Sequence, residues 1–136
     1  MANPGAASTV TTHPSNLATN QAIRLLAVQK GVNMSATGDT VLPIINATSY
    51  AVSNVVIANP STALSTAAAG LFPAPAATGT AIVASNTLTL ALNALVQETV
   101  ATSTAILSGQ NLYFNVATAQ GSGITADVYV YGYDLS

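Results

Sequence analysis

Apolar and polar residues alternate along several stretches of this chain, most clearly in its last fifty residues. In "NTLTLALNALV", which begins at Asn86, apolar side chains occupy every second position from Leu88 to Ala94. "QNLYFNVATA" and "ITADVYVYGYD", which begin at Gln110 and Ile124, show the same period of two. Because successive side chains of a strand point to opposite faces, the pattern predicts β-strands with one face in a core.

The last two of these stretches are predicted to pair as a terminal hairpin. The loop "QGSG", residues 120–123, separates them and is rich in the residues that form turns. Their apolar faces consist of Leu112, Phe114 and Val116 in the first run and of Ile124, Ala126, Val128 and Val130 in the second.

Strands before residue 86 are marked by β-branched residues that recur between turn signals. "SYAVSNVVIA", Ser49 to Ala58, has strand composition and is followed by a turn signal at Asn59-Pro60. "STAAAGLF" and "TAIVAS", residues 65–72 and 80–85, flank the breaker "PAPAATG". Each run is therefore predicted to be a strand.

The stretch "NQAIRLLAVQKGV", residues 20–32, fits two kinds of secondary structure. Its apolar spacing matches a helix that ends at Gly31, while Ile23, Leu25 and Ala27 also alternate. We favour a strand, because the sequence continues into a second apolar segment after a turn signal at Gly38-Asp39.

Seven or eight short strands at roughly ten-residue spacing predict an all-β fold. We expect one antiparallel β-sandwich of jelly-roll type over residues 21–136. Residues 1–20 are small and polar, contain Pro4 and Pro14, and show no periodic apolar face. They are predicted to form an extended N-terminal arm.

The charge content excludes several classes of partner. Only 4% of the residues are charged, and Arg24 and Lys30 are the only cations. Two cations cannot neutralise the phosphates that a duplex binder contacts, so nucleic acid is excluded as a partner. No apolar run is long enough for a membrane helix, and the start "MANPGAASTV" lacks the features of a signal peptide. We therefore expect a soluble, unexported chain without a membrane partner.

The titratable residues do not suggest an enzyme. The single histidine, His13, lies in the predicted arm, where no rigid surroundings would hold it for proton transfer. Asp127 and Asp134 are an odd number of residues apart, which puts them on opposite faces of one strand. Asp39 is interpreted as a turn residue and Glu98 as a solvated side chain. With no cysteine in the chain and four scattered acids, we predict no catalytic residue, metal site or cofactor.

Tyrosines are concentrated in the last predicted strand. Tyr129, Tyr131 and Tyr133 share the face opposite Val128 and Val130 and lie about 7 Å apart along an extended strand. Tyrosine is enriched at interfaces, because its large apolar ring carries a hydroxyl that can remain hydrated. The alternative interpretation is that the rings brace neighbouring strands of one sheet.

A fourth tyrosine is added to this candidate interface. It is Tyr113, which the alternation places on the outer face of the preceding strand.

Five segments of the chain resemble a known group of proteins. They are "RLLAVQKGVN", "ATGDTVLPI", "VVIANPSTALSTAAAGLF", "GTAIVA" and "LYFNVATAQGSGITADVYVYGYDL", and the likeness covers most of the chain after about residue 22. The group is that of the capsid decoration, or cement, proteins of tailed bacteriophages. Its motifs are turns and strand patterns, so the resemblance implies no catalytic or ligand-binding residue.

This resemblance implies a structural protein of the virion. Such modules are β-sandwiches or jelly rolls on the outside of the phage head, often trimers, that bridge neighbouring major capsid subunits. A decoration protein is made in the host cytoplasm, a reducing compartment in which a cysteine-free chain folds without difficulty. The expected partners are the major capsid protein and two further copies of the chain.

The main alternative is a head-fibre or receptor-binding tip that recognises a host surface glycan or protein. Such a tip usually exposes aromatic residues in loops, whereas the tyrosines here occupy strand positions. A minor structural protein of the tail is a third possibility.

Overall fold

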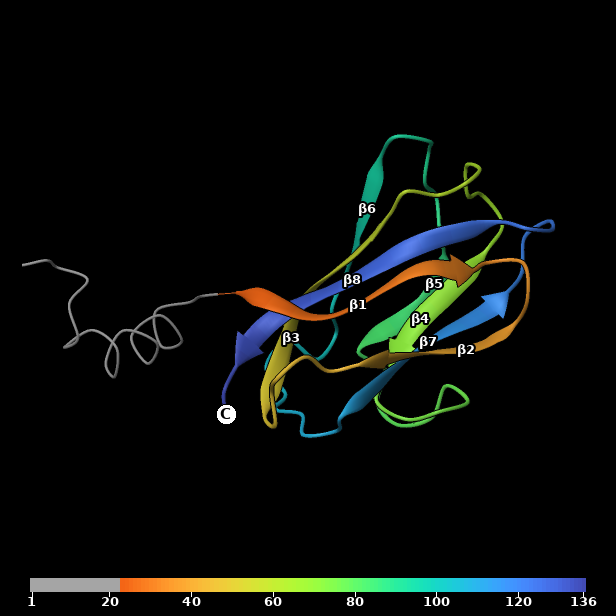
Figure 1. Cartoon of the computed structure of the whole chain (residues 1–136). Helices are drawn as coiled ribbons and strands as arrows, with labels where there is room; N and C mark the ends of the chain where they lie inside the picture. The colour runs from red at the N-terminus through yellow and green to blue at the C-terminus, as the bar shows by residue number, and fades with distance from the viewer. Residues whose placement is uncertain (1–22) are drawn as a thin grey trace, which may run out of the picture.

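The computed structural model describes residues 23–136, and within them the chain forms eight β-strands and no helix (Figure 1). The strands are β1 (Arg24–Asn33), β2 (Gly38–Pro43), β3 (Tyr50–Ala58), β4 (Ala68–Phe72), β5 (Val83–Thr87), β6 (Leu95–Glu98), β7 (Asn111–Thr118) and β8 (Thr125–Asp134). The predicted arm, residues 1–20, lies outside the described residues.

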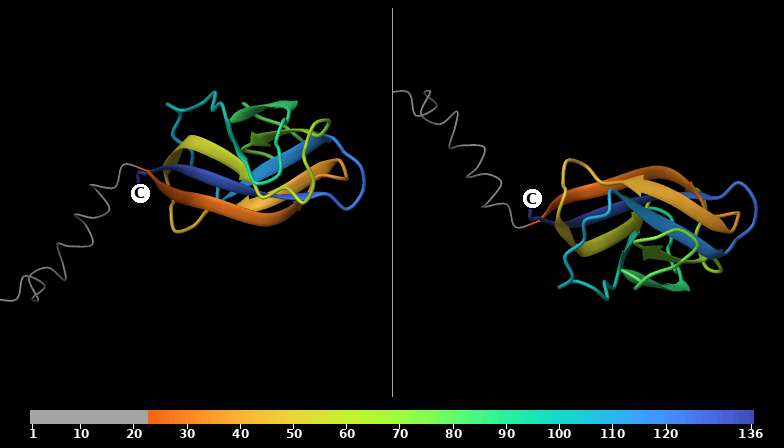
Figure 2. Two further views of the ribbon diagram at one scale, coloured as in Figure 1. Left: turned by 90° about the horizontal axis from the view of Figure 1, so that it is seen from above. Right: turned by 90° about the horizontal axis from the view of Figure 1, so that it is seen from below.

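The strands form two antiparallel sheets of four. Sheet A has the order β1-β8-β3-β6, and sheet B has the order β2-β7-β4-β5. The two sheets pack face to face as layers (Figure 2). Strands that follow one another in the chain lie in opposite sheets, except β4 and β5. The strand orders of the two sheets are those of an eight-stranded jelly roll. The predicted all-β antiparallel sandwich is confirmed.

The hydrophobic core fills the space between the two sheets. Phe114 of β7 and Val128 of β8 are both almost completely buried and come from opposite layers. The apolar faces predicted for the last two strands therefore do face the core. Their buried members are Leu112, Phe114, Val116, Ile124, Ala126, Val128 and Val130.

The prediction of a terminal hairpin is wrong. β7 pairs with β2 and β4 in sheet B, whereas β8 pairs with β1 and β3 in sheet A. The connection between them crosses from one layer to the other and bonds to the β1–β2 loop, where Met34 N–H donates to the Ile124 carbonyl at 2.8 Å. The alternation of apolar and polar residues shows which face of a strand is buried. It is the same whether the next strand pairs with this one in a hairpin or lies in the opposite sheet.

The prediction of one strand from Asn86 to Val96 is also wrong. β5 ends at Thr87 and β6 begins at Leu95, in the other sheet. Leu88 and Leu90 are buried in the core, but Leu92 is 55% exposed. The segment between the strands makes a single bridge, Leu64 to Leu90, and then leaves the core to change layers.

β1 is a strand, as predicted, and its irregular pairing explains the competing helical pattern. Its register with β8 shifts between Leu25 and Ala27 and again between Gln29 and Val32. At the first shift two consecutive residues, Leu26 and Ala27, both enter the core with no exposed surface. A bulge of this kind breaks the period of two and produces helix-like spacing.

Of the turn signals at Asn59-Pro60 and Gly38-Asp39, the first is confirmed and the second is displaced. β3 ends at Ala58 and Asn59 adopts a φ of 52°, so the break at Asn59-Pro60 is confirmed. The turn expected at Gly38-Asp39 lies earlier, because residues 34–36 form the bend and Gly38 already pairs with Val116.

Candidate functional site

The three tyrosines of β8 lie on the face of sheet A that points away from the core. β8 is an inner strand, so each ring has neighbours from other strands in the same row. Tyr129 lies between Val28 of β1 and Val56 of β3. Tyr131 lies between Leu25 and Asn54, and Tyr133 is opposite Ala51. Residues paired across strands point to the same side of a sheet, so these rows form one surface.

The same rows continue onto the far edge of sheet A. Gln97 of β6 pairs with Val56, and Leu95 pairs with Ala58. Beyond the end of β6, Leu107 forms a bridge with Tyr50 and packs against the core. The preceding residue, Ile106, therefore points to the opposite side, which is the side of the tyrosines.

We call this surface the outer face of sheet A. It consists of Leu25, Val28, Ala51, Asn54, Val56, Ala58, Leu95, Gln97, Ile106, Asp127, Tyr129, Tyr131 and Tyr133. Tyr129 and Tyr131 are half-buried by their neighbours, whereas Tyr133, Leu95 and Ile106 are 42%, 63% and 69% exposed. The tyrosines thus pack within the sheet and also present surface to the outside.

Tyr113, the fourth residue of the candidate interface, lies on the other side of the sandwich. In sheet B it pairs with Val41 of β2 and Phe72 of β4. The next outward row of that sheet is polar, because Asn115 donates to Asp39 at 2.8 Å. The structure therefore brings together Tyr129, Tyr131 and Tyr133 but not Tyr113.

Sequence reasoning did not identify the aliphatic part of the outer face of sheet A. Val28 and Val56 flank Tyr129, and Leu95 and Ile106 form the far edge. The alternation of Leu25 and Ala27 predicts that both lie on one face, but the bulge in β1 puts Leu25 on the outer face and Ala27 in the core. Ile106 precedes an isolated bridge outside any strand and has no sequence signal of its own.

At one end of β8, a carboxylate binds both β1 and the turn after β3. Asp127 accepts hydrogen bonds from Asn59 Nδ2 and from the Gly31 N–H, both at 2.9 Å. The Asn59 bond, with the Gly31 bond and nearby Lys30, lowers the pKa of Asp127. This carboxylate therefore has structural partners, rather than being only solvated.

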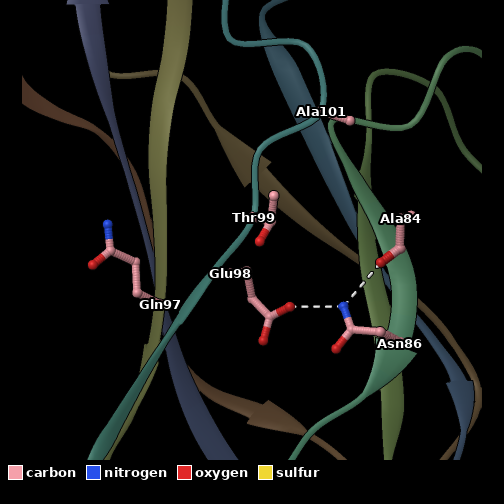
Figure 3. Close-up of a pocket in the computed structure, with 6 residues that line it drawn as sticks. All are labelled: Ala84, Asn86, Gln97, Glu98, Thr99 and Ala101. Carbon is pink, nitrogen blue, oxygen red and sulfur yellow. Dashed lines mark hydrogen bonds between the residues drawn. The ribbon is translucent and has the colours of Figure 1, made fainter.

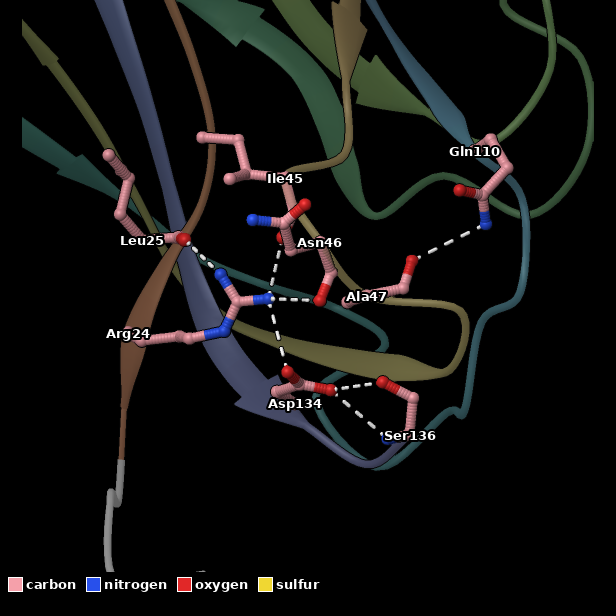
Figure 4. Close-up of polar contacts among 8 residues, drawn as sticks. All are labelled: Arg24, Leu25, Ile45, Asn46, Ala47, Gln110, Asp134 and Ser136. Carbon is pink, nitrogen blue, oxygen red and sulfur yellow. Dashed lines mark hydrogen bonds and ion pairs between the residues drawn. The ribbon is translucent and has the colours of Figure 1, made fainter. Parts of the chain in front are cut away.

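At the other end of β8, an ion pair joins the start of β1 to the end of β8 (Figure 4). Arg24 Nη2 lies 3.2 Å from Asp134 Oδ2 and also donates to the carbonyls of Ile45 and Asn46. Hydrogen bonds from Ser136, together with Arg24, lower the pKa of Asp134. The two carboxylates of β8 thus serve separate ends of the strand.

The remaining two acids also bind neighbouring segments. Asp39 lies in β2, not in a turn, and accepts a hydrogen bond from the Ala76 N–H at 2.7 Å. Glu98 accepts one from Asn86 Nδ2 at 2.7 Å across the open side of the sandwich, so it is not simply solvated. Glu98 and Asn86 line a shallow pocket of about 360 Å³ between β5 and β6 (Figure 3).

The fifth tyrosine, Tyr50, belongs to the core. It is fully buried, and its hydroxyl donates to the Gly109 carbonyl at 2.5 Å. Its backbone exchanges two further hydrogen bonds with Leu107, at 2.9 and 2.7 Å. Burial raises the pKa of Tyr50 to about 12. Tyr50 therefore anchors the loop between β6 and β7.

We expect the protein to lose stability as the pH rises from about 10 to about 12. The pKa of Tyr50 is raised in the folded state, so the unfolded chain releases this proton first. The stabilisation is fully present below the unfolded pKa and falls by up to about 3 kcal/mol across a two-unit difference. Urea unfolding at about pH 9 and about pH 11.5 measures the loss.

The variant Tyr50→Phe is the control for this prediction. It should be less stable at neutral pH by about 1 to 3 kcal/mol, since the Gly109 carbonyl loses its donor. Between about pH 9 and about pH 11.5, its free energy of unfolding should fall by less than that of the wild type. Equal losses in the two proteins would assign the effect to other groups.

The described part of the chain contains no cluster of His, Cys, Asp or Glu that could hold a metal ion. Within residues 23–136 there is also no helix with the length and apolar character needed to cross a membrane. His13 lies outside the described residues. Comparison with protein-family models, with curated proteins and with solved structures finds no match to this chain.

Proposed function

We propose that this protein is a capsid decoration protein of a tailed bacteriophage. The observation that carries the proposal is the outer face of sheet A: its rows that contain Tyr129 and Tyr131 carry no charged residue, on a jelly roll whose four acids all bind neighbouring segments. Such a protein acts by contact rather than by chemistry. The sequence resemblance to decoration proteins supports the same function.

The mechanism is mechanical. A phage head filled with DNA is under internal pressure, and a module that contacts two or more major capsid subunits adds binding free energy that must be lost before they separate. The protein is made in the host cytoplasm and joins the outside of the head. As a homotrimer it would repeat each weak contact three times, and avidity would hold it in place.

Binding to purified heads tests the proposal. Folded protein mixed with expanded heads of its phage should sediment with them, and quantitative mass spectrometry of intact particles should find hundreds of copies per head. A few dozen copies or fewer would instead indicate a head-fibre or receptor-binding tip. No binding by the folded protein would refute the decoration function.

A further inference from the structure

We infer that the pocket between β5 and β6 binds a primary ammonium group, the end of a lysine side chain of the major capsid protein. The inference deepens the proposed function and rests on it only for the identity of the protein that supplies the lysine. Three features of the pocket support it: an unused carboxylate oxygen, the placement of the chain's cations, and a lining that accepts hydrogen bonds.

Glu98 differs from the other three acids in its hydrogen bonds. Asp39, Asp127 and Asp134 each accept on both carboxylate oxygens. Glu98 accepts on Oε2, from Asn86 Nδ2 at 2.7 Å, and within residues 23–136 its Oε1 has no hydrogen-bond partner. The residue is half-buried in β6. A partly buried carboxylate oxygen of this kind is stabilised by a further donor.

Neither lysine nor arginine of this chain neutralises Glu98. Arg24 pairs with Asp134, and Lys30 lies near Asp127. These two cations, the only Lys and Arg in the chain, both lie in β1, at the opposite edge of sheet A from β6. The charge of Glu98 therefore attracts a cation from outside and repels anions.

The other polar groups of the pocket are also acceptors. Asn86 uses Nδ2 for two bonds, to Glu98 and to the Ala84 carbonyl at 3.0 Å, which holds its amide in place and leaves Oδ1 as an acceptor (Figure 3). Thr99 also lines the pocket, whereas the Gln97 side chain points away. An ammonium group has three donors and no acceptor, which suits Glu98 Oε1, Asn86 Oδ1 and the Thr99 hydroxyl.

Other ligands suit this pocket less well. An arginine guanidinium binds best to both oxygens of a carboxylate, but Oε2 of Glu98 already accepts from Asn86. Calcium takes about six to eight oxygen ligands, and the described residues contain no cluster of acids. A neutral sugar would leave the charge of Glu98 uncompensated. A volume of about 360 Å³ is enough for the end of one side chain.

The first test is an NMR titration of the folded full chain with Nα-acetyl-lysine methylamide at low ionic strength. The Asn86 side-chain amide and the Thr99 N–H should shift, with a dissociation constant in the millimolar range. The norleucine analogue, which lacks the ammonium, should cause no such shift. Glu98→Gln keeps an acceptor for Asn86 and should weaken lysine binding about 5-fold or more.

Asp39→Asn is the matched control for Glu98→Gln. It removes the same unit of charge from the chain, but from β2 in sheet B, so it should bind the lysine probe like the wild type. Circular dichroism should show the wild-type fold for both variants. With expanded heads in place of the probe, Glu98→Gln should bind more weakly than Asp39→Asn.

The two ligands separate the inference from the proposed function. No shift in the pocket with the lysine probe, or equal probe affinities of the two variants, overturns the inference, and the decoration function stands if that protein still binds heads. Pocket binding of the probe by a protein that does not bind heads has the opposite meaning. Shifts with methyl glucoside but not with the lysine probe would overturn the inference in favour of a glycan site.

Discussion

Replacing Gly132 by alanine is expected to destabilise the protein by at least about 3 kcal/mol, a large part of the stability of an ordinary domain. Gly132 lies in β8 between Arg24 of β1 and Val52 of β3, with its missing side chain on the core side. A Cβ at this position would overlap the Ala51 carbonyl oxygen and lie 2.7 Å from Leu26 Cδ1.

The size of this effect follows from which atoms would have to move. A clash with the end of a flexible side chain can be relieved by rotation, but the Ala51 carbonyl belongs to the backbone of the adjacent strand. β3 and β8 would have to separate at the point where the β3 register shifts, between Val52 and Asn54. Close-packed interiors resist such shifts.

Gly109→Ala is the matched control for Gly132→Ala. A Cβ on Gly109 would have no neighbour closer than the Asn111 carbonyl oxygen, at 3.7 Å, and Gly109 is not among the glycines with positive φ. This variant should stay within about 0.5 kcal/mol of the wild type. Urea unfolding followed by circular dichroism compares the two. A Gly132→Ala protein as stable as Gly109→Ala would mean that β3 and β8 are not held this closely.

The inward faces of the last strands could be predicted from the sequence because burial of one strand face is a local property. Phe114 and Val128 alternate with polar or aromatic residues, and both are buried as expected. The sheet to which a strand belongs is not a local property of its sequence. The loop after β7 can close a hairpin or cross the sandwich, and the choice depends on its bonds to the β1–β2 loop.

The error in sheet membership also explains why Tyr113 is grouped with the other three tyrosines in the sequence-based prediction. In a hairpin, the outward side chains of β7 and β8 would share one surface, so Tyr113 would join the other tyrosines. Because β7 lies in sheet B, Tyr113 faces the opposite way. Leu95 and Ile106 have no local signal for a related reason, since only pairing with distant β3 places them on the outer face of sheet A. Leu95 pairs with Ala58, and Leu107, which follows Ile106, forms a bridge with Tyr50.

Replacing Gln120 by alanine is expected to cost about 2 to 4 kcal/mol, which is the net value of several hydrogen bonds lost together. Its Oε1 accepts from the N–H groups of Ser65, Thr66 and Ala67, at 2.8, 2.7 and 3.1 Å. Its Nε2 donates to the Ala63 carbonyl at 2.8 Å. One side chain thus satisfies four backbone groups of the β3–β4 loop.

Gln120 also connects that loop to a second one. Its N–H donates to the Met34 carbonyl at 2.9 Å, and its own carbonyl accepts from Ser35 Oγ at 3.1 Å. These backbone bonds do not need the amide side chain, so Gln120→Ala should loosen the β3–β4 loop first. Amide hydrogen exchange should therefore rise at Ser65, Thr66 and Ala67.

Two further variants separate the roles of the amide. Gln120→Glu keeps an acceptor for the three N–H groups but loses the donor to Ala63, so its stability should lie between those of wild type and Gln120→Ala. Gln110→Ala removes an amide whose bonds, at 3.3 and 3.4 Å, are long, and it should cost less than about 0.5 kcal/mol. If Gln120→Ala and Gln110→Ala unfold at the same urea concentration, the Gln120 amide does not stabilise the end of the sandwich at which these loops meet.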